Sequence, residues 1–120
     1  MHYCLKDGHE EREIIFNEGD VIAYNQYFNQ YPLNKVPPLY CAKLWPEFQL
    51  FQQYANRNIL LKETEIDHTK SLETNETYLA HMCMIEKKKI KSFMKYTFKL
   101  DVHKNSENYI TIKQIFLEQL

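Results

Sequence analysis

The sequence predicts an α+β domain in which one long antiparallel sheet faces one central helix. In residues 39–55, Cys41, Leu44, Phe48 and Phe51 recur at intervals of three and four, as they do on the apolar face of a helix. From residue 59 onward the pattern changes to the alternation of apolar and polar residues that is typical of strands. A chain of 120 residues can bury a core of its own, and we expect one domain over residues 1–120.

A short strand and a helix are expected before the central helix. Residues 13–16 alternate as an edge strand does, and Asn17 is placed to cap a helix over residues 18–29. The spacing puts three apolar residues on the buried side of this helix, Val21, Tyr24 and Phe28. Asn25 is expected to face outward.

Prolines shape the approach to the central helix and its middle. Residues 30–38 contain three of the four prolines, which predicts an extended connector that ends in a Pro-Pro turn. Pro46 lies inside the helical pattern, where it removes a backbone donor. We therefore expect a kink at Pro46 or two short helices end to end.

Four more strands are expected in the second half of the chain, over residues 59–67, 76–86, 91–103 and 109–118. The third alternates most clearly and should be half-exposed. The second is apolar on both faces, which predicts a central strand buried on two sides or a subunit contact, and we favour the contact. The polar runs 87–91 and 104–108 predict hairpin turns.

Composition excludes several classes of function. The net charge of −1 offers no general attraction for nucleic acid or an anionic membrane surface. No apolar run approaches the roughly 20 residues that span a bilayer, so membrane insertion is not expected. The N-terminus lacks a signal-peptide pattern, and three distant cysteines do not suggest a disulfide framework. These features favour the cytoplasm.

The order of these elements, with VPPLYCAKLWPEF at residues 36–48, resembles the hot-dog fold, in which a long sheet wraps around a central helix. Residues 36–48 and residues 60–78, LLKETEIDHTKSLETNETY, are similar to segments of the hot-dog dehydratases of the MaoC type. The resemblance extends from about residue 13 to residue 120. It implies a homodimer that binds an acyl thioester, either acyl-CoA or acyl-ACP.

The catalytic signature of that family is missing. MaoC-type hydratases use an aspartate and a histidine within a motif close to Gly-Asp-x-Asn-Pro-Leu-His. Where this motif should fall, residues 25–39 read NQYFNQYPLNKVPPL, without Asp, His or Gly. Asn29 and Asn34 can hydrogen-bond a carbonyl but cannot exchange a proton near neutral pH. We therefore expect an acyl-thioester-binding domain without catalytic residues, cofactor or metal.

The expected ligand pocket lies between the Pro-Pro turn, the central helix and the second subunit. Its predicted lining consists of five residues, Tyr24, Asn29, Pro37, Pro38 and Trp45. One alternative is an active enzyme, either a thioesterase that uses Glu47 or a hydratase with a rearranged site. The other is a non-catalytic protein-interaction subunit, which predicts a large exposed apolar patch.

The remaining reactive residues have simpler interpretations. The five histidines, at positions 2, 9, 68, 81 and 103, lack the spacing of a helical metal pair. His68 ends a strand at a loop and could approach a ligand, whereas His81 is interpreted as a hydrogen-bonded core residue. Cys41 is interpreted as a buried apolar residue and not as a nucleophile. The lysines of residues 87–91 are interpreted as a solvated hairpin tip, and a grip on coenzyme A phosphates is the alternative.

Overall fold

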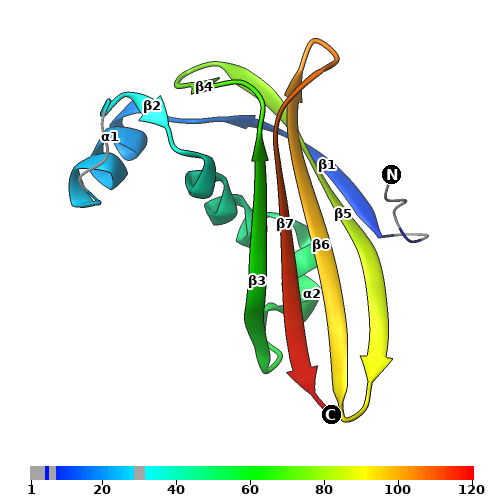
Figure 1. Cartoon of the computed structure of the whole chain (residues 1–120). Coiled ribbons are helices and arrows are strands. Elements are labelled where there is room, and N and C mark those ends of the chain that lie inside the picture. The colour runs from blue at the N-terminus through cyan, green and yellow to red at the C-terminus, as the bar shows by residue number, and fades with distance from the viewer. Residues whose placement is uncertain (1–4, 6–7, 29–31) are drawn as a thin grey trace.

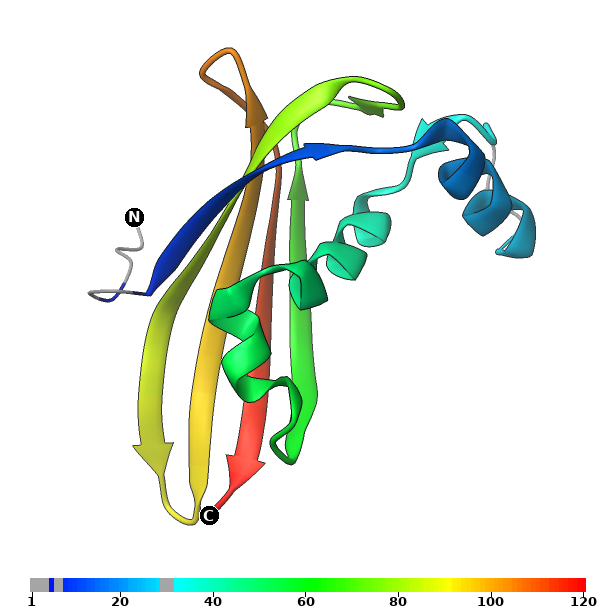
Figure 2. The ribbon, with the colours of Figure 1, turned by 180° about the vertical axis from the view of Figure 1, so that it is seen from behind.

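The computed structural model describes residue 5 and residues 8–28 and 32–120. One curved sheet carries the helices of the central segment on a single face, and a smaller unit projects from one end (Figures 1 and 2). The elements are, in order, β1 (His9–Ile15), α1 (Glu18–Tyr27), β2 (Lys35–Val36), the 3₁₀ helix η1 (Pro38–Glu47), α2 (Gln49–Ala55), β3 (Ile59–His68), β4 (Leu72–Glu73), β5 (Thr77–Ile90), β6 (Phe93–Lys104) and β7 (Glu107–Gln119).

The main sheet has the strand order β1-β5-β6-β7-β3, and all neighbouring strands are antiparallel. The strands expected in the second half of the chain are present as β3, β5, β6 and β7. The expected edge strand at residues 13–16 is β1, which begins earlier, at His9. A second sheet joins β2 to β4, with Val36 opposite Leu72, and ties the proline connector to the loop before β5.

The central helix is divided into two short helices end to end, as expected, at Phe48, two residues after Pro46. Its first half is the 3₁₀ helix η1 and its second half is α2, and Phe48 between them has extended backbone angles of φ −91° and ψ 126°. The break follows from Pro46, which has no amide hydrogen to donate to the preceding turn. Phe48 is fully buried at this joint and packs into the core.

The core lies between η1, α2 and the concave face of the sheet. The ring of Phe51 meets Phe98 edge-on with centroids 5.5 Å apart, and Tyr54 lies 4.7 Å from Tyr96. These contacts are possible because alternate residues of β6 face the helices, which confirms the predicted alternation of this strand. The buried apolar residues that β6 contributes are Tyr96, Phe98, Leu100 and Val102.

Helix α1 differs from its predicted wheel. Asn17 caps it, because the side-chain Oδ1 accepts a hydrogen bond from the Asp20 amide at 3.0 Å. Val21 is buried as expected, but Phe28 is 53% exposed and Asn25 is fully buried, so the predicted orientation of these two residues is wrong. Helix α1 stands away from the main sheet (Figure 2), and its buried Asn25 donates hydrogen bonds to the connector that follows it.

The outer face of the main sheet carries polar side chains, whereas its inner face carries apolar side chains. Ion pairs join neighbouring strands across it, for example Lys113 with Glu65 at 3.0 Å. His81 is half-buried on this face, and its side chain has no hydrogen-bond partner among the described residues, so its assignment as a hydrogen-bonded core residue is wrong. Burial is the main cause that lowers the pKa of His81. Cys83 is fully buried and disulfide-bonded. The odd number of distant cysteines therefore no longer supports a reducing compartment for this chain.

The hairpins turn without glycine. Asn105 and Ser106 form the two-residue turn between β6 and β7 with φ of 53° and 65°, as in a type I′ turn. The turn between β5 and β6 is Lys91–Ser92, so the prediction of a hairpin over residues 87–91 is wrong for residues 87–90. These residues continue β5 because they pair with the start of β6.

A network of polar side chains links β6 and β7 to the residues that follow α2. The Tyr96 hydroxyl donates to Glu118 Oε1 at 2.7 Å, and Arg57 Nε donates to Glu118 Oε2 at 2.8 Å. The Arg57 guanidinium also lies over the rings of Tyr54 and Tyr96. Among the described residues, no helix is long and apolar enough to cross a membrane.

Candidate functional site

A hollow beside the Pro-Pro turn is the candidate site. It has a volume of about 260 Å³ and opens where β2, the start of η1 and the loop between β3 and β4 meet. These segments are distant in sequence and are brought together by the pairing of β2 with β4 (Figure 1). The lining residues are Pro32, Lys35, Val36, Pro37, Pro38, His68 and Ser71.

Buried Asn25 holds the connector that forms one wall. Its Nδ2 donates to the carbonyl oxygens of Leu33 at 2.6 Å and of Lys35 at 2.8 Å. These carbonyls cannot accept hydrogen bonds within a helix, because the prolines of the connector prevent a helix from forming there. The ammonium group of Lys35 forms an ion pair with the carboxylate of Glu73 at 2.7 Å. Asn25 and the β2–β4 pairing therefore position the wall before any ligand arrives.

The lining combines an apolar surface with a few polar groups. The rings of Pro37 and Pro38 and the side chain of Val36 can contact an acyl chain, while Lys35, His68 and Ser71 supply hydrogen-bond donors. Pockets that enclose a small ligand usually measure about 300–1,000 Å³. At about 260 Å³ this hollow is smaller, so it can enclose only part of a ligand. The rest of the ligand would have to be enclosed by a second chain.

The predicted lining residues are only partly brought together. Pro37 and Pro38 line the hollow. Tyr24 is half-buried and packs against Tyr40, whose ring is 5.0 Å away. Trp45 is 3% exposed and lies in the core, where its Nε1–H has no hydrogen-bond partner in the part of the chain that the structure describes. Asn29 lies outside the described residues, and the ligand-binding role of all five residues stays a prediction.

Two polar residues of the hollow were not anticipated. Lys35 and Ser71 are separated by more than thirty positions and meet only because β2 pairs with β4. Strands of two residues have no detectable alternation, so the sequence contains no periodic signal for this contact. His68 was expected to be able to approach a ligand, and it lines the hollow.

Other candidate catalytic groups do not join this site. Glu47 is exposed at the end of η1 and is not part of the lining. Cys41 is fully buried, and burial raises its pKa to about 12, which disfavours the nucleophilic thiolate. Among the described residues, no group of three or more His, Cys, Asp or Glu side chains is arranged to hold a metal ion.

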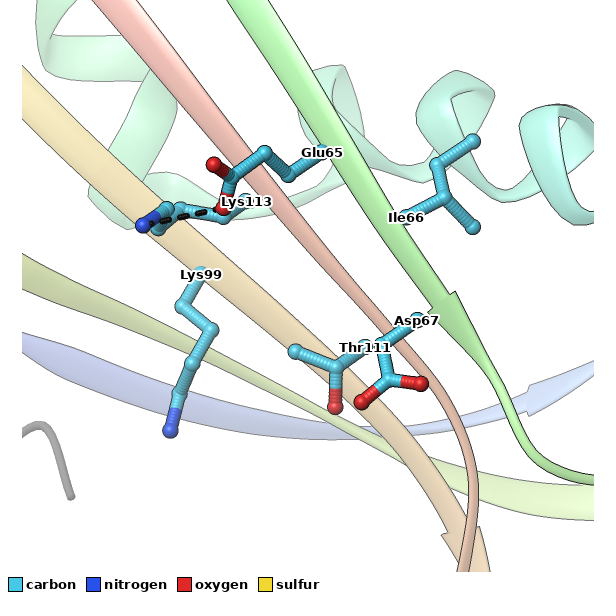
Figure 3. A pocket seen from close by; sticks show the side chains of 6 residues that line it. All are labelled: Glu65, Ile66, Asp67, Lys99, Thr111 and Lys113. Carbon is cyan, nitrogen blue, oxygen red and sulfur yellow. Dashed lines mark ion pairs between the residues drawn. The ribbon is translucent and has the colours of Figure 1, made fainter.

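A larger hollow of about 450 Å³ lies on the outer face of the sheet, lined by Glu65, Ile66, Asp67, Lys99, Thr111 and Lys113 (Figure 3). Three of its four charged side chains, Glu65, Lys99 and Lys113, already have partners. Lys113 pairs with Glu65, and Lys99 Nζ lies 3.4 Å from Asp101, which also accepts a hydrogen bond from Thr111. A ligand would have to replace these contacts, so we assign the candidate site to the Pro-Pro turn.

The lysines at the end of β5 lie far from the candidate site. Lys87, Lys88 and Lys89 are exposed near the hairpin to β6, whereas β2 and β4 lie at the opposite end of the molecule (Figure 1). Lys87 lies over the ring of Tyr96. These lysines cannot reach the phosphates of a ligand that occupies the Pro-Pro hollow of the same chain.

Sequence comparison identifies close relatives. The family model described as "Uncharacterised conserved protein VraC" matches residues 1–120. Protein VraC of Staphylococcus epidermidis is 42% identical over 118 residues, which cover 98% of each chain. Protein VraC of Staphylococcus aureus is 36% identical over 120 residues, which cover 100% of this chain and 99% of the relative.

Solved structures share the fold at low sequence identity. The HadBC (3R-hydroxyacyl-ACP dehydratase) complex of Mycobacterium tuberculosis matches with a TM-score of 0.76 at 9% identity, over 92% of this chain and 93% of that chain. A MaoC-like dehydratase of Phytophthora capsici has a TM-score of 0.74 at 11% identity, over 92% and 47%. A Streptococcus mutans protein bound to acetyl CoA has a TM-score of 0.63 at 10% identity, over 93% and 82%. These matches confirm the expected hot-dog fold.

Proposed function

Because the chain belongs to the VraC family and has the hot-dog fold, we propose that it is an acyl-thioester-binding domain without the Asp/His pair of the MaoC-type dehydratases. The observation that carries this proposal is the hollow at the Pro-Pro turn, which has an apolar wall and donors but no acid-base pair. The ligand class is acyl-CoA or acyl-ACP.

The chemistry of the lining supports this ligand class. An acyl chain gains most from the surface of Pro37, Pro38 and Val36, because it removes apolar area from water. A thioester carbonyl can accept a hydrogen bond from Ser71 or from His68. Two structural neighbours are associated with ligands of this class, since one is a 3R-hydroxyacyl-ACP dehydratase and another is bound to acetyl CoA.

The same lining argues for binding without turnover. Hydration of an enoyl thioester needs one group to activate water and another to handle the α-proton. No Asp or His occurs between residues 21 and 47. His68 is the imidazole of the hollow, and none of the other lining residues is a carboxylate that would orient it.

A second subunit belongs to this proposal, because the hollow is small and open. The predicted homodimer is one assembly that would supply the missing wall. A pair of two different hot-dog chains is the other, and a structural neighbour is described as the HadBC complex. Neither assembly requires a catalytic residue from this chain.

Exposed apolar side chains favour the protein-interaction subunit as a second candidate function. Leu60 is 71% exposed and Leu61 is 53% exposed, both on β3, and Tyr27 of α1 is 81% exposed. Large apolar patches on an isolated subunit commonly mark a surface that a partner covers. This reading needs no ligand in the Pro-Pro hollow.

Native mass spectrometry with short- and long-chain enoyl-CoA separates these functions. We expect the wild-type chain to retain the intact thioester, without gain of one water and without release of coenzyme A. Ser71→Phe should fill the hollow and abolish retention, whereas Thr69→Phe, at an exposed position outside the lining, should keep it. Hydrated product would establish an enzyme, and equal retention by both variants would exclude this hollow as the site. Absence of ligand from the wild-type chain would leave the interaction subunit.

A further inference from the structure

The hairpin between β5 and β6 carries most of the positive charge that forms no ion pair within the chain. Residues 87–95, KKKIKSFMK, contain five lysines and no Asp or Glu. Four of these lysines are exposed and form no ion pair in the part of the chain that the structure describes, namely Lys87, Lys88, Lys89 and Lys91. Every other described lysine or arginine except Lys43 and Lys62 pairs with a carboxylate. The net charge of −1 therefore conceals one strongly positive end of the molecule.

The unpaired lysines surround the end of the hairpin. Lys87 lies opposite Tyr96, whose ring packs against α2 on the inner face of the sheet. Lys88, the next residue, lies opposite Lys95 on the outer face. Residues directly opposite each other share a face and successive residues alternate, so the lysine run places charge on both faces. Lys91 adds a further charge within the two-residue turn itself.

Apolar side chains gather at the turn, beyond the lysines of β5. Ile90 and Phe93 lie opposite each other next to the turn and are 40% and 38% exposed. Leu120 is 60% exposed, and its amide donates a hydrogen bond to the carbonyl oxygen of Ser92 at 2.8 Å. The hairpin and residue 120 lie together at one end of the molecule (Figures 1 and 2). We refer to residues 87–93 together with Leu120 as the hairpin tip.

The apolar surface of the hairpin tip continues onto the neighbouring strands. Leu60, which is 71% exposed, lies opposite Leu117. Both residues line a hollow of about 280 Å³ that begins at Phe93, and its lining consists of Asn58, Leu60, Leu61, Lys62, Phe93, Leu117 and Gln119. The one charged side chain of this lining is Lys62, which also lacks an ion pair among the described residues. The whole end therefore combines exposed apolar surface with unpaired positive charge.

This arrangement matches the layers of an anionic membrane surface. Peripheral membrane binding requires apolar side chains that enter the boundary below the headgroups and basic side chains that contact the anionic headgroups. In the hairpin tip the apolar side chains lie at the outermost turn, and the flexible stems of the lysines behind them can bring their ammonium groups to the headgroup level. A projecting turn offers little area to a folded protein, because stable interfaces usually cover about 800 Å² on each partner.

We propose that the hairpin tip binds the surface of a lipid bilayer that contains anionic phospholipids. The side chains of Ile90, Phe93 and Leu120 enter the boundary between headgroups and acyl chains, and the four unpaired lysines contact lipid phosphates. The chain stays peripheral, since only a turn enters the bilayer. The Pro-Pro hollow lies at the opposite end of the molecule, so this interaction does not depend on an acyl thioester (Figure 1).

Cosedimentation of the full chain with phosphatidylcholine vesicles, with and without phosphatidylglycerol, tests the charge requirement. The variant Lys88→Gln/Lys89→Gln removes two lysines of the hairpin tip. The matched control Lys70→Gln/Lys104→Gln changes the net charge equally at the far end of the sheet, where both lysines pair with glutamates. Each lysine near an anionic surface contributes about fivefold in affinity, so the tip variant should bind roughly 25-fold more weakly.

We expect the wild-type chain to bind only the vesicles that contain phosphatidylglycerol, and this binding should weaken as salt is raised. The control should bind like wild type. Failure of the wild-type chain to bind the anionic vesicles would overturn the proposal, and so would equal losses in the two variants. Binding to polyglutamate without binding to anionic vesicles would also overturn it, because an acidic polypeptide would then be the partner.

A tryptophan at position 93 tests whether the apolar side chains enter the bilayer and requires no change of charge. We expect the fluorescence of Phe93→Trp to be quenched by phosphatidylglycerol vesicles with brominated acyl chains. Phe28→Trp, at a 53% exposed position of the unit that projects from the other end, should not be quenched. Trp45 is 3% exposed and gives a constant background. A bound Phe93→Trp chain without quenching would refute the insertion of the tip.

Discussion

The hydroxyl of Tyr96 allows a clean test of the buried network, because Tyr96→Phe removes that group and leaves the ring. The hydroxyl donates to the Glu118 carboxylate at 2.7 Å, while the ring keeps its contact with Tyr54. A hydrogen bond to a charged group contributes about 1.5–3 kcal/mol. We expect Tyr96→Phe to lower the free energy of unfolding by about 2 kcal/mol, which corresponds to a fall in Tm of roughly 8 °C for a chain of this size.

Urea unfolding measures this change through the fluorescence of Trp45, the single tryptophan, which is 3% exposed in the folded chain. The control is Tyr109→Phe, since the Tyr109 hydroxyl has no hydrogen-bond partner among the described residues and its ring is half-buried. The control should stay within about 0.5 kcal/mol of wild type. Equal losses in the two variants would refute the assigned role of the hydroxyl.

The pH dependence of the same pair has a definite sign. The Tyr96 hydrogen bond, followed by that of Arg57, lowers the pKa of Glu118. The carboxylate therefore stabilises the fold above the pKa of the unfolded chain, and this contribution disappears as the pH falls through the lowered value. The difference between wild type and Tyr96→Phe should shrink in acid. Burial raises the pKa of Tyr96 to about 12, so the hydroxyl remains a donor until the pH approaches that value.

Two further outcomes follow from burial. Phe48→Ala empties the joint between η1 and α2 and should lower the free energy of unfolding by about 3–5 kcal/mol. Phe28→Ala, at a 53% exposed position, is its control, and urea midpoints that shift equally would contradict the role of the joint. Cys41 should resist a thiol reagent at pH 8 until the chain unfolds, because burial raises its pKa to about 12. Peptide mass spectrometry locates the label, and rapid modification of Cys41 in the folded chain would disprove this.

Periodicity made the sheet and the central helix predictable. In β6 the apolar residues alternate without exception from Met94 to Val102, and no other regular structure accommodates that pattern. The break at Pro46 could be foreseen because proline lacks an amide donor. The orientation of α1 was mistaken because a helical wheel sorts residues by hydropathy alone. Asn25 is buried for a different reason, namely that the carbonyls of Leu33 and Lys35 need donors.

The candidate site was less accessible to sequence reasoning. Pro37 and Pro38 could be assigned to its wall because a double proline fixes the local backbone. Lys35 and Ser71 could not, since their meeting depends on two strands of two residues each. The error at residues 87–90 has a similar origin. A lysine-rich run looks like a turn, yet its position in a strand is decided by the register with the start of β6.

The pairing of β1 with β5 has a consequence for the order in which the fold can form. His9 lies opposite Cys83, so the first strand to leave the ribosome waits for a partner made much later. A nascent chain that has emerged as far as α2 contains β1 and β2, but neither of the strands with which they pair. The strands β5, β6 and β7 follow one another through two tight turns and can pair as soon as they are made. We therefore expect assembly to start with β5, β6 and β7, and β1 and β3 to be added to them from either side.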